Sequence, residues 1–173
     1  MSLSLVAASF VFADDKPRVS PHETVTANID GSDVTIVYGR PYTKDPKTGA
    51  PRKVWGELIP FGKVWRTGAD EATLLTLKQD FDIGGTKVPA GTYSLFSLPD
   101  KDGAKLIVNK QTGQWGTKYD EKQDLVRIPM TKGSFDKPLD QFTITIDKNA
   151  GGGGNLRLAW ETTQYVVTLK AAK

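Results

Sequence analysis

The sequence predicts an all-β fold, namely an antiparallel β-sandwich or jelly-roll-like single domain over residues 20–170, with a closed barrel as the alternative. From Val25 onwards, apolar residues recur with a period of two, which is typical of half-buried strands. No window there keeps a helical period over ten residues, although one turn of helix near 54–58 fits the pattern. The 17 Gly and 10 Pro favour many short elements joined by turns.

The first strands form a predicted hairpin. Apolar and polar residues alternate over 24–29 and over 34–38, and the turn-forming pair Asp30 and Gly31 lies between them. A further strand contains Leu75 and Leu77, and another ends at Ile83 before two glycines. The run 93–98 is apolar on both faces, which predicts a central strand.

The carboxyl half continues this pattern. Strands are predicted over 106–108 and 125–130, and then over 142–146, 156–160 and 165–169, which together resemble a meander. The total is about ten short strands. The glycine run 151–154 is interpreted as a flexible loop, because a phosphate-binding loop would be followed by a helix and here a strand pattern follows.

The amino end resembles an export signal. The stretch from Leu3 to Phe12 is apolar and about ten residues long, which is the length of a signal core and too short to span a bilayer. Cleavage is expected after Ala13, so that residues 1–13 would be removed and the mature chain would contain no membrane span. We therefore expect a periplasmic or secreted protein.

One segment, residues 39–71, does not follow the strand pattern. It has 33 residues, including four Pro and five Gly, and unstructured connections of that length are uncommon in compact domains. Its aromatic residues are more than a disordered tract usually contains. We therefore predict one long ordered loop that packs over the sandwich as a cover, and we call it the cover segment.

The cover segment also holds the excess positive charge of the chain. Its seven Lys and Arg against four Asp and Glu give +3, which equals the net charge of the whole protein. Arginine suits bidentate binding of carboxylate or phosphate, so an anionic ligand is one interpretation. The other is that Arg40 and Arg66 pair internally with Asp70 and Glu71.

Composition excludes several classes of function. Without Cys, the chain has no disulfide, no thiol nucleophile and no Cys-ligated metal, and one His excludes a multi-histidine site within one chain. A net charge of +3 confined to one segment is far below that of a nucleic-acid-binding protein, so no nucleic acid is expected as a partner.

Several short blocks resemble a known family. They are Ser20-Pro21-His22, Tyr38-Gly39-Arg40-Pro41, the stretch Val64 to Thr73 that contains Trp-Arg-Thr-Gly, and the stretch Pro89 to Phe96 that contains Pro-Ala-Gly-Thr-Tyr-Ser. In this order they resemble the bacterial domain of unknown function 2911 (DUF2911), from about Ser20 to Leu169. The resemblance implies export and supplies no established reaction.

The chain departs from that family pattern in two places. Asp70 stands where the resemblance leads us to expect Asn, and the stretch from Tyr42 to Arg52 is longer than usual. Some members carry a label borrowed from asparagine-forming amidotransferases. That label does not suit this chain, which has neither a Cys nucleophile nor a nucleotide-binding pattern.

The first functional hypothesis is a non-catalytic binding domain. Its partner would be an anionic small molecule, a saccharide or an envelope protein. Arg40 and Arg66 would hold the anionic group, and Tyr42, Trp55 or Trp65 would offer a stacking face. For Trp65 and Trp160, packing in the core is the competing interpretation.

The second hypothesis is a hydrolase or lyase. His22 or Glu71 would act as the base, Asp70 or Glu71 as the acid, and Arg66 would stabilise charge. Adjacent residues of an extended chain point to opposite faces, so Asp70 and Glu71 share a site only if the chain bends there. A metal held by His22, Asp70 and Glu71 is chemically conceivable, but no ligand spacing supports it, and we assign no metal and no cofactor.

Overall fold

The computed structural model describes residues 18–173, so the predicted export signal over residues 1–13 lies outside the described residues. These described residues form nine strands, and the all-β prediction is confirmed. The strands are β1 (His22–Ile29), β2 (Ser32–Gly39), β3 (Ala69–Leu77), β4 (Phe81–Ile83), β5 (Thr86–Val88), β6 (Gly91–Pro99), β7 (Gly103–Asn109), β8 (Asp124–Lys148) and β9 (Gly154–Ala171).

Helical structure is nearly absent from residues 18–173, where the one helical element is the 3₁₀ turn η1 (Glu121–Gln123). The segment 54–58, where a turn of helix fits the sequence, instead forms tight turns and isolated bridges. Within the described part of the chain, no helix is long and apolar enough to cross a membrane.

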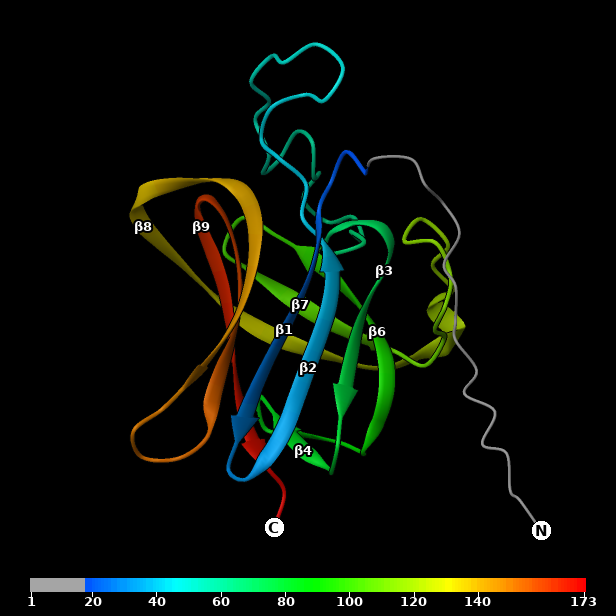
Figure 1. Cartoon of the computed structure of the whole chain (residues 1–173), viewed down its shortest axis with the longest axis vertical. Helices are drawn as coiled ribbons and strands as arrows, with labels where there is room; N and C mark the ends of the chain where they lie inside the picture. Colours follow the sequence, from blue (N-terminus) through cyan, green and yellow to red (C-terminus); the bar gives the residue numbers. More distant parts are fainter. Residues whose placement is uncertain (1–17) are drawn as a thin grey trace, which may run out of the picture.

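All nine strands belong to one antiparallel sheet in the order β1-β2-β3-β6-β7-β8-β9-β4-β5. The sheet curves so that β1 also contacts β8 and β9, with which it is not paired (Figure 1). On the inside, the ring of Tyr38 on β2 meets that of Phe142 on β8 at 5.7 Å, and the Tyr38 hydroxyl accepts a 2.8 Å hydrogen bond from the Ile144 amide. The β1–β2 end of the sheet thus faces β8 and β9 across the core, as in a sandwich.

The predicted meander of three strands is wrong in its number of strands, because 156–160 and 165–169 both belong to β9. The third stretch, 142–146, belongs to β8, which also contains the separately predicted strand 125–130. The β8–β9 register shifts twice between Ser134 and Thr143, and Glu161 has a positive φ of 51°. Such irregularities bend a strand without ending it, so each apparent pair of short strands is one long bent strand.

The core confirms that β6 is a central strand. Its residues Tyr93 to Ser97 are all buried, and the strand lies between β3 and β7. Leu95 belongs to the main core, whereas Phe96 points to the other face and packs there with Ala72 and Ile107. Both faces of β6 are therefore covered.

The cover segment connects β2 to β3, and much of it packs as predicted. Val54, Trp55 and Ile59 are buried in the main core, and Trp65 forms a bridge with Ser97 of β6. Residues 46–51, in contrast, are exposed, and the cyan chain that follows β2 extends beyond the end of the sheet (Figure 1). The segment is thus both a cover and a projecting loop.

Candidate functional site

The strand register brings His22 close to the acidic pair that follows the cover segment. His22, the first residue of β1, pairs with Gly39 of β2, and Gly39 pairs with Ala69 of β3. These three residues form a row across the sheet, and Asp70 follows Ala69 directly. Residues 48 positions apart in the sequence therefore become neighbours.

A local bend allows both carboxylates to reach the histidine. Asp70 has a left-handed φ of 64°, and Thr67 and Gly68 before it also have positive φ values. The Thr67 hydroxyl donates a 2.9 Å hydrogen bond to Ser97, and the Asp70 carbonyl accepts one of 2.8 Å from the Gly116 amide. Strained backbone of this kind often occurs at functional sites. The chain thus bends at Asp70, as it must if Asp70 and Glu71 are to share one site.

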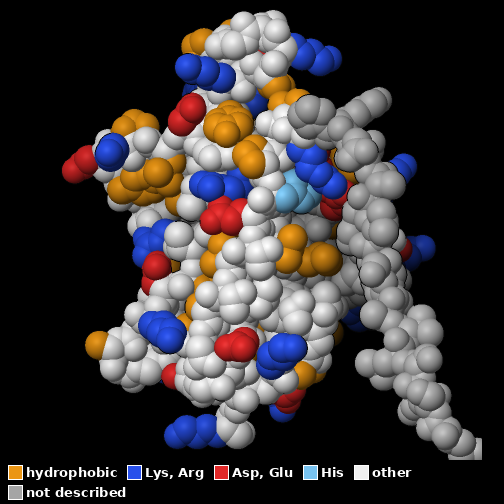
Figure 2. All heavy atoms as spheres, viewed as in Figure 1, with side chains coloured by type: hydrophobic (Ala, Val, Ile, Leu, Met, Phe, Trp, Pro, Cys, Tyr) orange, Lys and Arg blue, Asp and Glu red, His pale blue; other side chains and the backbone are white. Residues whose placement is uncertain are grey.

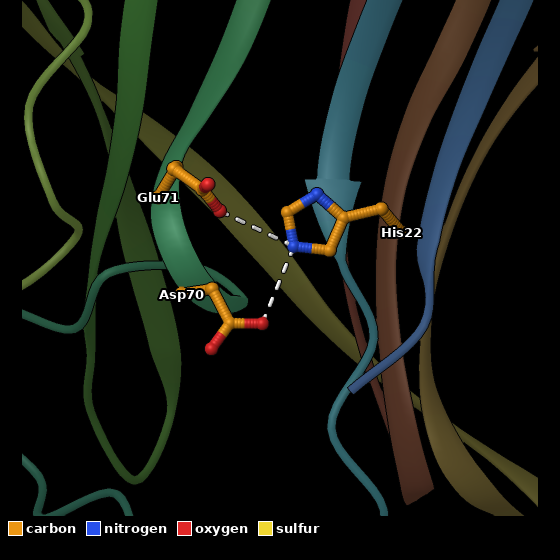
Figure 3. A group of neighbouring side chains, drawn as sticks. All are labelled: His22, Asp70 and Glu71. Carbon is orange, nitrogen blue, oxygen red and sulfur yellow. Dashed lines mark hydrogen bonds and ion pairs between the residues drawn. The ribbon is translucent and has the colours of Figure 1, made fainter. Parts of the chain in front are cut away.

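The result is a cluster at the surface. The Nε2 atom of His22 lies 3.3 Å from Asp70 Oδ2 and 3.4 Å from Glu71 Oε2 (Figure 3). The histidine is visible on the face shown in Figure 2, beside basic and acidic side chains. We call His22, Asp70 and Glu71 the His–Asp–Glu cluster.

Arg18 completes this cluster, and sequence reasoning did not identify it. Its two terminal nitrogens approach the two Glu71 carboxylate oxygens at 2.5 and 2.8 Å. The nitrogen at 2.5 Å also lies 2.9 Å from His22 Nε2 and 3.9 Å from Asp70 Oδ2. Nothing in the sequence distinguishes Arg18. It precedes His22 by four residues, and that spacing predicts no contact in an extended segment.

The pairing with Arg18 bears on the proposed acid and base roles of Glu71. Hydrogen bonds from the Arg18 guanidinium lower the pKa of Glu71 to about 2. A carboxyl group with such a pKa is ionised at neutral pH and is a weak base. At neutral pH, Glu71 therefore carries a negative charge that the Arg18 guanidinium balances.

The Arg18–Glu71 pair should make stability depend on pH in the acidic range. Because the pKa of Glu71 falls from 4.5 to about 2 on folding, its contribution is fully present above pH 4.5 and is lost as the pH falls towards 2. We expect Glu71→Gln to lower the melting temperature at pH 6 and to have little effect near pH 2. Since both side chains are about two-fifths exposed, the effect stays below about 1 kcal/mol.

Thermal unfolding followed by circular dichroism from pH 2 to 7 measures this difference. In an Arg18→Ala background, Glu71→Gln should change the melting temperature much less, because the hydrogen bonds that lower the pKa are gone. An undiminished difference would show that another contact is responsible.

Arg40 has a different internal partner from the one considered above. It forms a 2.7 Å ion pair with Glu23 and donates hydrogen bonds to the Phe142 carbonyl and the Thr143 hydroxyl, at 3.1 and 2.9 Å. These contacts tie the start of the cover segment to β1 and β8. Arg40 is thus paired internally, but with Glu23 rather than with Asp70 or Glu71.

Arg66 lines a pocket with a volume of about 470 Å³. That size is typical of small-molecule sites. Most of the wall is apolar and aromatic, and two arginines contribute charge. The lining residues are Pro41, Arg52, Leu58, Ile59, Val64, Trp65, Arg66, Gly68, Phe96, Gly116, Thr117, Tyr119 and Trp160. We call this the Arg66 pocket.

The two arginines of this pocket have no carboxylate partner among residues 18–173. Arg66 donates one hydrogen bond, from Nε to the Gly68 carbonyl at 3.1 Å, and its terminal nitrogens donate none to a described residue. Arg52 donates to the carbonyls of Tyr42 and Thr43. The pocket thus carries positive charge that these residues do not neutralise.

The structure separates the four residues predicted to bind a ligand. Trp65 and Arg66 both line the Arg66 pocket, whereas Arg40 does not, and Tyr42 lines a second, smaller pocket of about 230 Å³ beside Arg52. Trp65 also packs against Phe142 and Trp160, with ring centroids 4.8 and 6.1 Å apart. It is therefore both part of the core and part of the pocket wall.

Comparison with known proteins gives one match. A family model described as "Protein of unknown function (DUF2911)" matches residues 20–169. No curated protein and no solved structure matches the chain.

Proposed function

Since the chain belongs to the DUF2911 family of proteins of unknown function, we propose its function from its own sequence and candidate site: an exported, non-catalytic domain that binds a small organic anion in the Arg66 pocket. The apolar stretch from Leu3 to Phe12 supports the export part of this proposal. One observation carries the binding part. The Arg66 guanidinium lines an aromatic pocket, and its terminal nitrogens contact no acceptor among the described residues.

The chemistry of the wall indicates which ligand would suit it. A guanidinium group binds carboxylate or phosphate through two parallel hydrogen bonds. The partly exposed rings of Trp65 and Tyr119 offer aromatic surface on which a sugar or aromatic ring can pack, whereas Trp160, which also lines the pocket, is buried. The Tyr119 hydroxyl is already bonded to Asp124 at 2.6 Å, so this residue offers mainly its ring. The ligand class is therefore a ring compound with one acidic group, such as a uronate, an aromatic carboxylate or a sugar phosphate.

The hydrolase or lyase hypothesis has less support, because it places Arg66 in one site with His22 and Glu71. The lining of the Arg66 pocket includes neither His22 nor Glu71. Arg18, rather than Arg66, is the cation beside Glu71.

A screen with two arginine variants tests the binding proposal. Uronates, aromatic carboxylates and sugar phosphates are screened by ligand-observed NMR, and the dissociation constant of the best binder is measured by calorimetry. Arg66→Gln should weaken binding about tenfold or more, because a charge-assisted bidentate contact is lost. Arg40→Gln should leave affinity within about twofold, because Arg40 does not line the pocket.

Two results would contradict the proposal. One is the absence of any binder in the panel. The other is a binder whose affinity does not change in Arg66→Gln. A larger loss in Arg40→Gln than in Arg66→Gln would move the ligand site to the Arg40 side of the cover segment.

A further inference from the structure

The His–Asp–Glu cluster is separate from the proposed ligand pocket and calls for an explanation of its own. Its three side chains come from β1 and β3 and point towards one another (Figure 3). Their potential ligand atoms all lie within 4.8 Å of one another. Imidazole with two carboxylates is a donor set that suits divalent transition metals.

The Arg18 guanidinium lies against the side chains of the cluster. A guanidinium group only donates hydrogen bonds, and one of its nitrogens lies 2.9 Å from His22 Nε2 and 2.5 Å from Glu71 Oε2. Nε2, Asp70 Oδ2 and Glu71 Oε2 are thus three potential ligand atoms around one position. A cation is needed there, and the Arg18 guanidinium supplies its charge.

The distances in the cluster match those in a metal site. Ligand atoms about 2.1 Å from a tetrahedral zinc ion are about 3.4 Å from each other. The Nε2 to Oδ2 distance is 3.3 Å and the Nε2 to Oε2 distance is 3.4 Å. Both distances from Nε2 to the carboxylate oxygens therefore match the spacing of ligand atoms around a tetrahedral zinc ion.

The surroundings leave room for an ion. A Cβ atom on Gly39 would lie 3.2 Å from His22 Nε2, so the lack of a side chain there keeps this nitrogen accessible. The side chains of His22 and Asp70 are about one-quarter exposed, so that water can complete the coordination shell.

We propose that His22, Asp70 and Glu71 form a binding site for a divalent transition-metal ion, for which the guanidinium group of Arg18 competes as an internal cation. A metal ion carries twice the charge of the guanidinium and approaches each ligand atom more closely. Binding of the metal displaces Arg18 from Glu71. Arg18 thereby sets the metal concentration at which the site fills.

Zinc titration of the full chain, with any purification tag removed, tests this proposal. Zn²⁺ alone is the probe, and its affinity is measured at pH 7.5 by competition with a chelating dye. Arg18→Ala should bind one Zn²⁺ about tenfold more tightly than the unmodified chain, because the competing cation is gone. Arg18→Gln should behave in the same way, since it also removes the charge.

Further variants identify the ligands. In the Arg18→Ala background, His22→Ala and Asp70→Asn should each weaken zinc binding about tenfold or more. Arg157→Ala is the matched control, because Arg157 pairs with Asp147 elsewhere on the surface, and it should bind zinc as the unmodified chain does. Far-ultraviolet circular dichroism confirms that every variant is folded.

The proposal is overturned if Arg18→Ala binds zinc no more tightly than the unmodified chain, or if the tight site survives His22→Ala. It is also overturned if neither protein binds zinc, in which case the Arg18–Glu71 contact is a surface ion pair only. These outcomes do not depend on the Arg66 pocket, so this inference and the proposed function fail separately.

Discussion

Replacing Trp160 by alanine should lower the free energy of unfolding by about 3–5 kcal/mol, which is typical of a truncated core tryptophan. The side chain is 1% exposed, and its ring stacks on that of Trp65 and meets that of Phe142 at 5.9 Å. Its indole N–H also donates a 3.2 Å hydrogen bond to the Thr43 hydroxyl. The substitution removes both the packing and that bond, and it leaves a cavity beneath the cover segment.

Urea denaturation followed by circular dichroism measures this loss. Trp115→Ala is the matched control, because Trp115 is 48% exposed, and it should change stability by less than about 0.5 kcal/mol. Equal losses in the two variants would contradict the assignment of Trp160 to the core. Since Trp160 also lines the Arg66 pocket, Trp160→Ala should weaken the binder from the anion screen as well.

The alternating pattern predicts the strands well because it reflects burial on one face, which is a local property of the chain. The hairpin of β1 and β2 is the clearest case. Val34, Ile36 and Tyr38 are buried while Asp33 and Val37 are exposed, and the turn contains Asp30 and Gly31, both with positive φ. Trp160 also points inward, as its strand pattern predicts.

Pairing between distant strands cannot be predicted in this way. The pairing of β9 with β4 depends on contacts between segments far apart in the sequence. The same is true of the continuation of β8 from Asp124 to Lys148. A bent strand and two strands joined by a loop give the same local alternation. The period of two therefore gives the fold class but neither the strand order nor the number of strands.

The candidate sites show the same limit. His22, Asp70 and Glu71 could be named from their chemistry, but their convergence depends on the strand register and on the left-handed backbone at Asp70. Arg18 has no distinguishing signal in the sequence. The pairing of Arg40 with Glu23 likewise follows from the hairpin register and not from either residue type.

Replacing Gly39 by alanine should cost about 2–3 kcal/mol, because the new methyl group has no space. A Cβ atom there would lie 2.4 Å from the carbonyl oxygen of Ala69. The Cβ position is fixed by the backbone of β2 and the carbonyl oxygen belongs to the backbone of β3, so no side-chain rotation relieves the contact, and the strands must separate. Gly151→Ala is the control: a Cβ there meets nothing within 4 Å, and its stability should change by less than about 0.5 kcal/mol.

Gly39→Ala should also affect the His–Asp–Glu cluster, because Gly39 lies between His22 and Ala69 in the row across the sheet. Separation of β2 from β3 moves His22 on one side away from Asp70 on the other. In the Arg18→Ala background, Gly39→Ala should therefore weaken zinc binding about tenfold or more, measured at a temperature where the protein remains folded. Lost stability with unchanged zinc affinity would show that the close approach of β2 and β3 holds the sheet together without positioning the cluster.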